Sequence, residues 1–284
     1  MSVDILQDKI RKLKNPTMLE LPALRLPEGF PGEGEARYGD YCDALLEAVK
    51  GLIPAVRISF AAFCLLGPEG IAQLQRTLRR ARELGYYVAL DAPEIWSPAM
   101  AELTARHFFG PDSRYPCDGV IIPSYLGSDI WKAFLPYVRD SGKDVFCVVR
   151  TGNKSGSEIQ DRQTGSRLAH VAAADIANRH GETMCGRSGF HQIGVVTSAT
   201  SASAVSGLRT KYNRMFLLVD GLDYPNANAR NCAAAFNQFG HGAVVCSGSA
   251  ITCAWEESED DPIALAAAAA ERVKKNLTRY ITIL

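Results

Sequence analysis

The chain has 284 residues, of which 47% are hydrophobic and 22% are charged, enough for one barrel domain or two smaller domains. Its 31 Lys and Arg residues balance 31 Asp and Glu residues, so no basic excess exists to neutralise nucleic-acid phosphates or anionic lipid. The first dozen residues contain no apolar run long enough for a signal peptide or a membrane span. We therefore expect a cytoplasmic protein that binds neither nucleic acid nor membranes.

Short β-branched runs alternate with amphipathic helical stretches, as in repeated β-α units around a parallel sheet. The predicted strands are residues 17–21, 53–59, 86–91, 117–123, 144–149, 192–197, 214–219 and 242–247. Eight such units in a chain of this length favour a closed (β/α)8 barrel over an open doubly wound sheet. No Pro/Gly/Ser-rich linker divides the chain, so we expect a single barrel domain over residues 1–284, with residues 1–16 as a helical lead-in.

Two of the predicted helices carry clear signals. Residues 71–84 repeat apolar side chains at three- and four-residue spacing, with most arginines on other faces. The last helix is expected to begin at Asp261 and Pro262, a capping carboxylate followed by proline in the first turn. Because the active site of a (β/α)8 barrel lies at the C-terminal ends of its strands, residues just after each strand are the functional candidates.

Neither cysteines nor histidines predict a metal site. The eight cysteines form no C-x-x-C pair and mostly lie in apolar runs, so we interpret them as reduced core thiols. The five histidines show no i, i+4 pair and no H-x-H motif. The acidic run over residues 256–261 is interpreted as a solvated turn that caps the last helix. We expect no metal and no cofactor.

In chain order, the strand ends resemble the bacterial branch of the orotidine 5'-phosphate decarboxylase family over nearly the whole chain. The matching segments are residues 14–17 (KNPT), 57–67 (RISFAAFCLLG), 118–129 (DGVIIPSYLGSD), 150–160 (which begins RTGN), 194–200 (GVVTSAT) and 242–254. YLGSD and RTGN are the most distinctive. The resemblance implies a barrel that converts orotidine 5'-phosphate to UMP and CO2 in pyrimidine biosynthesis, and a dimer whose active sites meet at the barrel mouths.

The sequence differs from the family pattern at the residues that carry out the family's reaction. The family carries D-x-K-x-x-D after the third strand, and its lysine protonates the carbon that CO2 leaves. Here Asp91 matches the first aspartate, but Pro93 replaces the lysine and Trp96 replaces the second aspartate. Proline has neither an ammonium group nor a backbone N–H, so it donates no proton. Arg57 matches the second-strand lysine and keeps its charge, yet it releases no proton at neutral pH.

The resemblance also locates altered ribose and phosphate sites. The family's ribose-binding aspartate falls near Pro22, unless Glu20 substitutes for it. Ser249 stands where an arginine clamps the phosphate. In the loop after the seventh strand the family's glycines are replaced, and Asp223 adds a charge that repels phosphate. We expect poor phosphate affinity.

Other family positions remain candidates for ligand binding. Thr151 and Asn153 lie in the loop that matches the base-recognition loop, although Gly152 replaces the serine that contacts the pyrimidine. Ser247 and Gly248 precede the lost arginine position. The candidate ligand contacts are therefore Thr151, Asn153, Ser247 and Gly248.

Two functional hypotheses follow. The preferred one is a non-decarboxylating homologue with a binding, regulatory or assembly role. The alternative is an active decarboxylase or lyase with a rearranged site that uses Asp91, Arg57 and Glu94. The Asp91–Arg57 pair is interpreted either as a ligand site or as an ion pair kept for packing. Glu94 and Trp96 are interpreted either as the lining of a new pocket or as the filling of a lost cavity or an interface.

Assembly is predicted from Trp96. In the family this position carries a charged group that reaches into the neighbouring subunit's site, and here it is apolar and flanked by Ile95 and Pro98. Large aromatic side chains anchor interfaces. We expect a homodimer with Trp96 at or near the interface on the C-terminal face, and a heterodimer with an active paralogue is the alternative.

Overall fold

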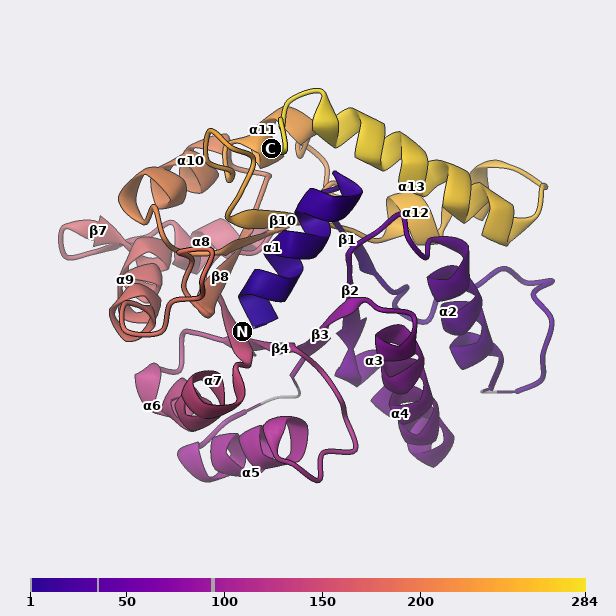
Figure 1. The fold of residues 1–284 in the computed structure, drawn as a ribbon, viewed down its shortest axis with the longest axis horizontal. Coiled ribbons are helices and arrows are strands. Elements are labelled where there is room, and N and C mark those ends of the chain that lie inside the picture. Colours follow the sequence, from indigo (N-terminus) through magenta and orange to yellow (C-terminus); the bar gives the residue numbers. More distant parts are fainter. Residues whose placement is uncertain (1, 35, 93–94) are drawn as a thin grey trace.

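A computed structural model describes residues 2–34, 36–92 and 95–284 (Figure 1). Two positions of the sequence analysis, Pro93 and the candidate Glu94, lie outside the described residues.

The predicted (β/α)8 barrel is confirmed. Within the described residues, eight parallel strands close in the order β1-β10-β9-β8-β5-β4-β3-β2. Each predicted strand is present, with its ends shifted by at most three residues. The barrel strands are β1 (Thr17–Glu20), β2 (Ala55–Ser59), β3 (Tyr87–Asp91), β4 (Gly119–Pro123), β5 (Asp144–Val148), β8 (Ile193–Ser198), β9 (Leu217–Asp220) and β10 (Ala243–Ser247). A small antiparallel hairpin of β6 (Gln163–Thr164) and β7 (Arg167–Leu168) stands outside the barrel.

Helices surround the barrel (Figure 1). They are α2 (Ala36–Ala48), α3 (Phe60–Cys64), α4 (Gly67–Glu83), α5 (Pro98–Phe109), α6 (Ser128–Lys132), α7 (Leu135–Ser141), α8 (Ser157–Gln160), α9 (Ala169–Gly181), α10 (Ala202–Lys211), α11 (Ala229–Ala233), α12 (Ser249–Thr252) and α13 (Pro262–Thr278). Short 3-10 turns cover Lys154–Gly156 and Ala254–Glu257. The helix expected over residues 71–84 is α4, and it begins four residues earlier than its apolar repeat. The cap at the start of α13 is confirmed, because Asp261 Oδ2 accepts a hydrogen bond of 2.8 Å from Ala264 N.

The first helix, α1 (Ser2–Leu13), crosses the N-terminal end of the barrel (Figure 1). Its polar side chains bond to loops that lead into strands. Gln7 Oε1 accepts from Gly242 N at 2.9 Å, just before β10. Asp4 accepts from the backbone N–H groups of residues 187 and 188, before β8, at 3.0 and 2.8 Å. With α1 across this end, the C-terminal ends of the strands form the mouth available to ligands.

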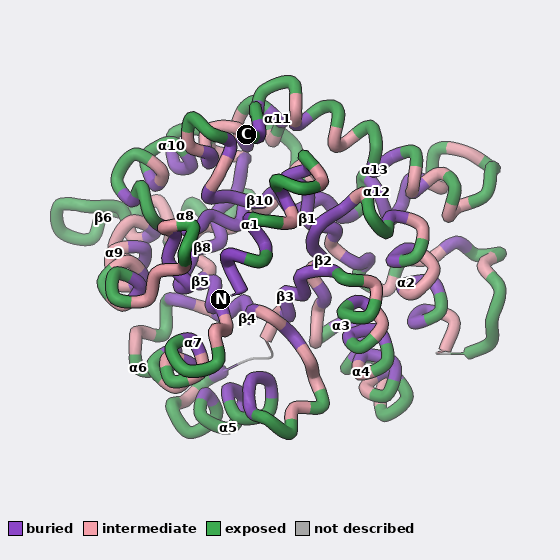
Figure 2. The backbone as a smooth tube through the Cα atoms, viewed as in Figure 1, coloured by how far each residue is buried: buried purple, intermediate pink, exposed green. Residues whose placement is uncertain are grey.

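The core follows the strands, which are buried along nearly their whole length (Figure 2). All eight cysteines are free, and six are buried, but Cys64 is exposed and Cys185 is partly exposed. The core-thiol interpretation is therefore wrong for these two, because they lie on short surface segments rather than in the strands. Burial raises the pKa of the Cys117 thiol to about 12, which keeps it protonated and unreactive.

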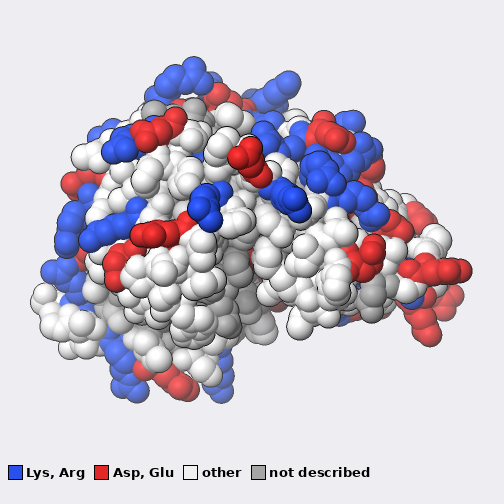
Figure 3. Space-filling view, turned by 90° about the horizontal axis from the view of Figure 1, so that it is seen from below, with Lys and Arg blue, Asp and Glu red and all other residues white. Residues whose placement is uncertain are grey.

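The surface carries both signs of charge. On the face drawn in Figure 3, basic and acidic side chains are mixed around an area with few charges. No helix among the described residues is long and apolar enough to span a bilayer.

Candidate functional site

Arg57 lies at the barrel mouth among carboxylates from three other strands. Its Nη2 is 2.8 Å from Asp91 Oδ2, and its Nε donates to the same oxygen at 2.9 Å. Its Nη1 lies 3.4 Å from Glu20 Oε1 and 3.7 Å from Asp220 Oδ1. Glu20, Asp91 and Asp220 are the last residues of β1, β3 and β9. Barrel closure therefore gathers strand ends that lie as far as 200 residues apart in the sequence around one guanidinium.

Burial dominates the electrostatics of this cluster. It raises the pKa of Glu20 to about 7, and the neighbouring carboxylates add to the rise while Arg57 opposes it. Burial also raises the pKa of Asp220. Burial alone would lower the pKa of Arg57, but Asp91 and Glu20 hold that pKa well above its usual value. Arg57 thus stays charged, and its charge is shared among three acidic side chains.

The raised pKa of Glu20 predicts a dependence of stability on pH. The folded protein keeps Glu20 protonated up to about pH 7, whereas the unfolded chain loses this proton near pH 4.5. Wild-type stability is therefore expected to fall as pH rises through this window. In Glu20→Gln this loss disappears, so the Tm advantage of the variant should be absent at pH 4.5 and largest above pH 7. Equal Tm differences at pH 4.5 and pH 8 would contradict the assignment.

Asp223, in the loop after β9, bonds to the backbone at the junction of β10 and α12. The Asp223 carboxylate accepts hydrogen bonds from the backbone N–H groups of Gly248 at 2.6 Å, Ser249 at 3.1 Å and Ala250 at 3.2 Å. From the sequence, Asp223 is expected to be a charge that repels phosphate. The structure goes further, because the amides that an anion would use already have an internal carboxylate partner.

The loop after β5 is folded on itself. Thr151 N donates to Gln160 Oε1 at 2.9 Å, and Thr151 Oγ1 donates to Asn153 Oδ1 at 2.5 Å. The ring of Tyr224 lies over Gly152, where an added Cβ would be 2.6 Å from Tyr224 Cδ2. A serine at position 152 would collide with this ring unless the ring moved.

Two pockets open at the mouth. One of about 410 Å³ lies between the ends of β3, β4 and β5, and its lining is Asp91, Ala92, Ile121, Ile122, Pro123, Tyr125, Val148, Thr151 and Gln160. The other, of about 200 Å³, is bordered by Glu20, Pro22, Asp223 and Ser249 together with Leu21, Ala23, Arg25, Gly248, Thr252 and Cys253. Within the described residues, no group of three or more His, Cys, Asp or Glu side chains is placed to hold a metal ion.

Comparison with known proteins tests the family resemblance. No protein-family model matches the chain. The orotidine 5'-phosphate decarboxylase of Rhodopirellula baltica is 28% identical over 228 residues, covering 79% of this chain and 76% of the relative. That of Petrotoga mobilis is 23% identical over 267 residues, covering 92% and 91%. The family resemblance is confirmed, since the chain is similar to curated orotidine 5'-phosphate decarboxylases over most of its length.

Solved structures agree on the fold. A putative orotidine-monophosphate-decarboxylase from Toxoplasma gondii superposes with a TM-score of 0.81 at 20% identity, covering 97% of this chain and 98% of that one. A putative orotidine 5'-phosphate decarboxylase from Streptomyces avermitilis gives a TM-score of 0.80 at 19% identity, covering 98% and 95%. At these identities the likeness concerns the barrel itself.

Some of the candidate residues predicted from the sequence lie in contact with one another in the structure, and others do not. Asp91 and Arg57 form the expected pair. Ser247 is buried, and its Oγ has no hydrogen-bond partner among the described residues. The amide of Gly248 is engaged by Asp223. Trp96 is 71% exposed and borders an apolar pocket of about 320 Å³, whose other lining residues are Ile95, Pro123, Tyr125 and Leu126.

Sequence reasoning missed two features. Asp220 joins the Arg57 cluster, and the predicted strand stopped one residue short of it, so the rule that strand ends carry function would have found it. Asp161 Oδ1 lies 3.2 Å from His170 Nδ1, and no sequence motif predicts this contact. Their pairing depends on the folding of a loop onto α9, which periodicity does not encode.

Proposed function

We propose that this protein is a non-decarboxylating member of the orotidine 5'-phosphate decarboxylase family, a barrel kept for a binding or regulatory role. The observation that carries the proposal is the Asp223 carboxylate on the backbone amides of residues 248–250. Orotidine 5'-phosphate would have to displace a charged group that already makes three hydrogen bonds. No arginine from position 249 compensates, because that residue is serine.

The carboxylates around Arg57 at the barrel mouth support the same proposal. The substrate carries a carboxylate as well as a phosphate, and Glu20, Asp91 and Asp220 already share the single guanidinium of Arg57. Adding further negative charge to such a cluster is costly in a partly buried site. Pro93, by its chemistry alone, supplies no proton for the decarboxylated carbon.

The test is direct. Purified protein should convert orotidine 5'-phosphate to UMP no faster than the uncatalysed reaction, followed by absorbance, and titration calorimetry should show no UMP binding up to about 1 mM. A catalytically active relative from the same family serves as the positive control. Turnover far above the uncatalysed rate would overturn the proposal.

One observation favours an active lyase as the second candidate. Pro93 cannot hold a proton near neutral pH, but Glu20 can, because its pKa is raised to about 7. Glu20 also belongs to the mouth cluster, since its Oε1 lies 3.4 Å from Arg57 Nη1. In this alternative Asp91, Arg57 and Glu94 act with Glu20 as the acid. If turnover is found, Asp91→Ala and Glu20→Gln should each abolish it while the protein stays folded, and unchanged rates would remove both residues from the mechanism.

A homodimer is part of the proposal. Trp96 borders the apolar pocket on the C-terminal side, beside the exposed side chains of Tyr125 and Leu126. Burying these three side chains against a second copy would remove a large apolar area from water. A heterodimer with an active paralogue would use the same surface.

Light scattering tests this assembly. The wild type is expected to be dimeric, and Trp96→Asp is expected to shift it to the monomer because a charge would be buried at the contact. Ile5→Asp is the matched control, since Ile5 is exposed on α1 at the opposite end of the barrel. A monomeric wild type, or a Trp96→Asp dimer as tight as the parent, would refute the homodimer.

A further inference from the structure

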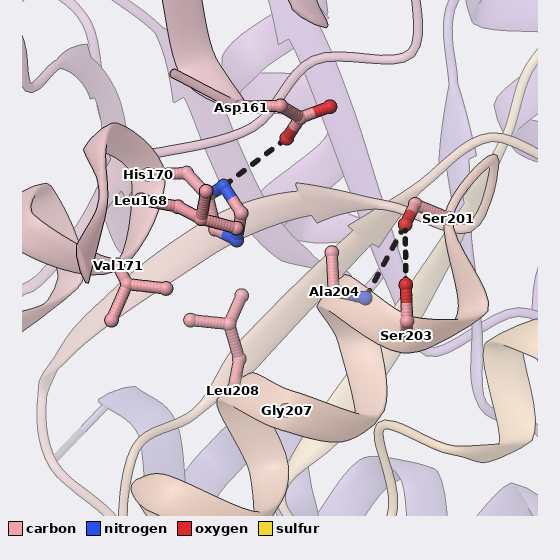
Figure 4. Close-up of a pocket in the computed structure, with 9 residues that line it drawn as sticks. All are labelled: Asp161, Leu168, His170, Val171, Ser201, Ser203, Ala204, Gly207 and Leu208. Atoms are coloured by element: carbon pink, nitrogen blue, oxygen red, sulfur yellow. Dashed lines mark hydrogen bonds and ion pairs between the residues drawn. The ribbon is translucent and has the colours of Figure 1, made fainter. Parts of the chain in front are cut away.

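Another pocket lies between α9 and α10, separate from the mouth pockets (Figure 4). It has a volume of about 350 Å³ and shares no lining residue with the mouth pockets. Its lining is Asp161, Leu168, His170, Val171, Ser201, Ser203, Ala204, Gly207 and Leu208. This size suits a small metabolite.

His170 presents one ring nitrogen to this pocket. Its side chain is only 3% exposed, and Nδ1 lies 2.9 Å from the carbonyl oxygen of Gln160 and 3.2 Å from Asp161 Oδ1. Both neighbours are hydrogen-bond acceptors, so Nδ1 carries a proton, and the tautomer with Nδ1–H presents Nε2 as an acceptor. Within the described residues Nε2 has no hydrogen-bond partner, and Figure 4 shows it directed away from Asp161, toward the side of the pocket where Leu208 lies.

Asp161 fixes this orientation without leaving a net charge in the pocket. Its two oxygens accept from Arg150 Nε at 3.1 Å and Nη2 at 2.9 Å. The hydrogen bonds from Arg150 lower the pKa of Asp161, so the carboxylate stays ionised and paired. A histidine oriented by a carboxylate, with its other nitrogen toward an open pocket, is arranged to receive a hydrogen bond from a ligand.

The opposite wall attracts negative charge. It is the N-terminus of α10, a ten-residue helix whose cap Ser201 accepts from Ala204 N at 3.3 Å. The hydroxyls of Ser201 and Ser203 lie 3.2 Å apart at this end. Helix N-termini stabilise carboxylates and phosphates. The rest of the lining is aliphatic, from Leu168, Val171 and Leu208.

We propose that this pocket binds a small carboxylic acid that carries a hydroxyl or amino group and an aliphatic side chain. The carboxylate lies at the N-terminus of α10 beside the serine hydroxyls. The hydroxyl or ammonium group donates to His170 Nε2, and the aliphatic part packs against Leu168, Val171 and Leu208. The site is independent of the proposed function at the barrel mouth.

The probes are 2-hydroxy-4-methylpentanoate and leucine, titrated into the full-length protein and followed by amide NMR. At least one is expected to give saturable shifts in the segment 201–208, with a Kd of about 1 mM or tighter. 4-Methylpentanoate, which lacks the donor group, is expected to bind at least about 10-fold more weakly because His170 Nε2 stays unpaired. The two probes distinguish a hydroxy acid from an amino acid.

Two variants locate the site. Gly207 lines the pocket, and a Cβ added there meets no atom within 4 Å, so Gly207→Leu fills the pocket without a backbone clash. Ser206→Leu, on the exposed surface of the same helix, is the matched control. Gly207→Leu and His170→Phe should each weaken binding at least about 10-fold, and Ser206→Leu should not. No saturable shifts at about 10 mM, or equal binding by Gly207→Leu and the wild type, overturns the proposal.

Discussion

Replacing Arg57 with methionine is expected to lower the free energy of unfolding by about 3 to 5 kcal/mol at pH 8, measured by denaturant titration. The Arg57 side chain is 14% exposed and is the cation that Glu20, Asp91 and Asp220 face. Without it, carboxylates from three strand ends remain together in a partly buried site with no opposite charge. Removing one partner of a buried ion pair costs far more than the pair contributes over apolar packing.

Arg80→Met is the control, because it removes an arginine charge from the surface rather than from the barrel mouth. Arg80 pairs with Glu47 on the surface, and both side chains are 42% exposed. Arg80→Met should therefore cost no more than about 1 kcal/mol. At pH 5 the Arg57→Met loss should shrink, because Glu20, whose pKa is raised to about 7, is protonated in the folded state at that pH. The raised pKa of Asp220 acts in the same direction. A loss no larger than that of Arg80→Met would show that the cluster is solvated.

Freeing the loop amides at α12 is expected to restore affinity for a nucleoside monophosphate. In Asp223→Ala combined with Ser249→Arg, the amides of residues 248–250 lose their internal acceptor and an arginine returns to the phosphate position. UMP should then bind at least about 10-fold tighter than to the wild type, measured by calorimetry. Loss of the Asp223 hydrogen bonds should cost about 1 to 2 kcal/mol of stability, as for other capping carboxylates.

Ser249→Arg alone is the control for this gain. With Asp223 present, the new guanidinium would pair with that carboxylate, so little change in UMP affinity is expected. If the double variant binds UMP no better than the wild type, occupancy of the amides is not what excludes phosphate, and the Arg57 cluster becomes the leading cause.

The sequence by itself determined the architecture and the residue types at several of the positions that the family uses. Alternating strand and helix periodicities reflect local backbone geometry and burial, so the eight barrel strands and the Asp261 cap were readable from short windows. The absence of an ammonium group at Pro93 and of an arginine at Ser249 is likewise a property of residue type.

Only the tertiary structure decided which side chains meet at the barrel mouth. Asp220 meets Arg57 because the barrel closes, although 163 residues separate them in the sequence. Asp223 faces the amides at residues 248–250, and Tyr224 covers Gly152, because one loop after β9 folds over the mouth. Such contacts depend on long-range packing and loop conformation, which residue spacing does not specify.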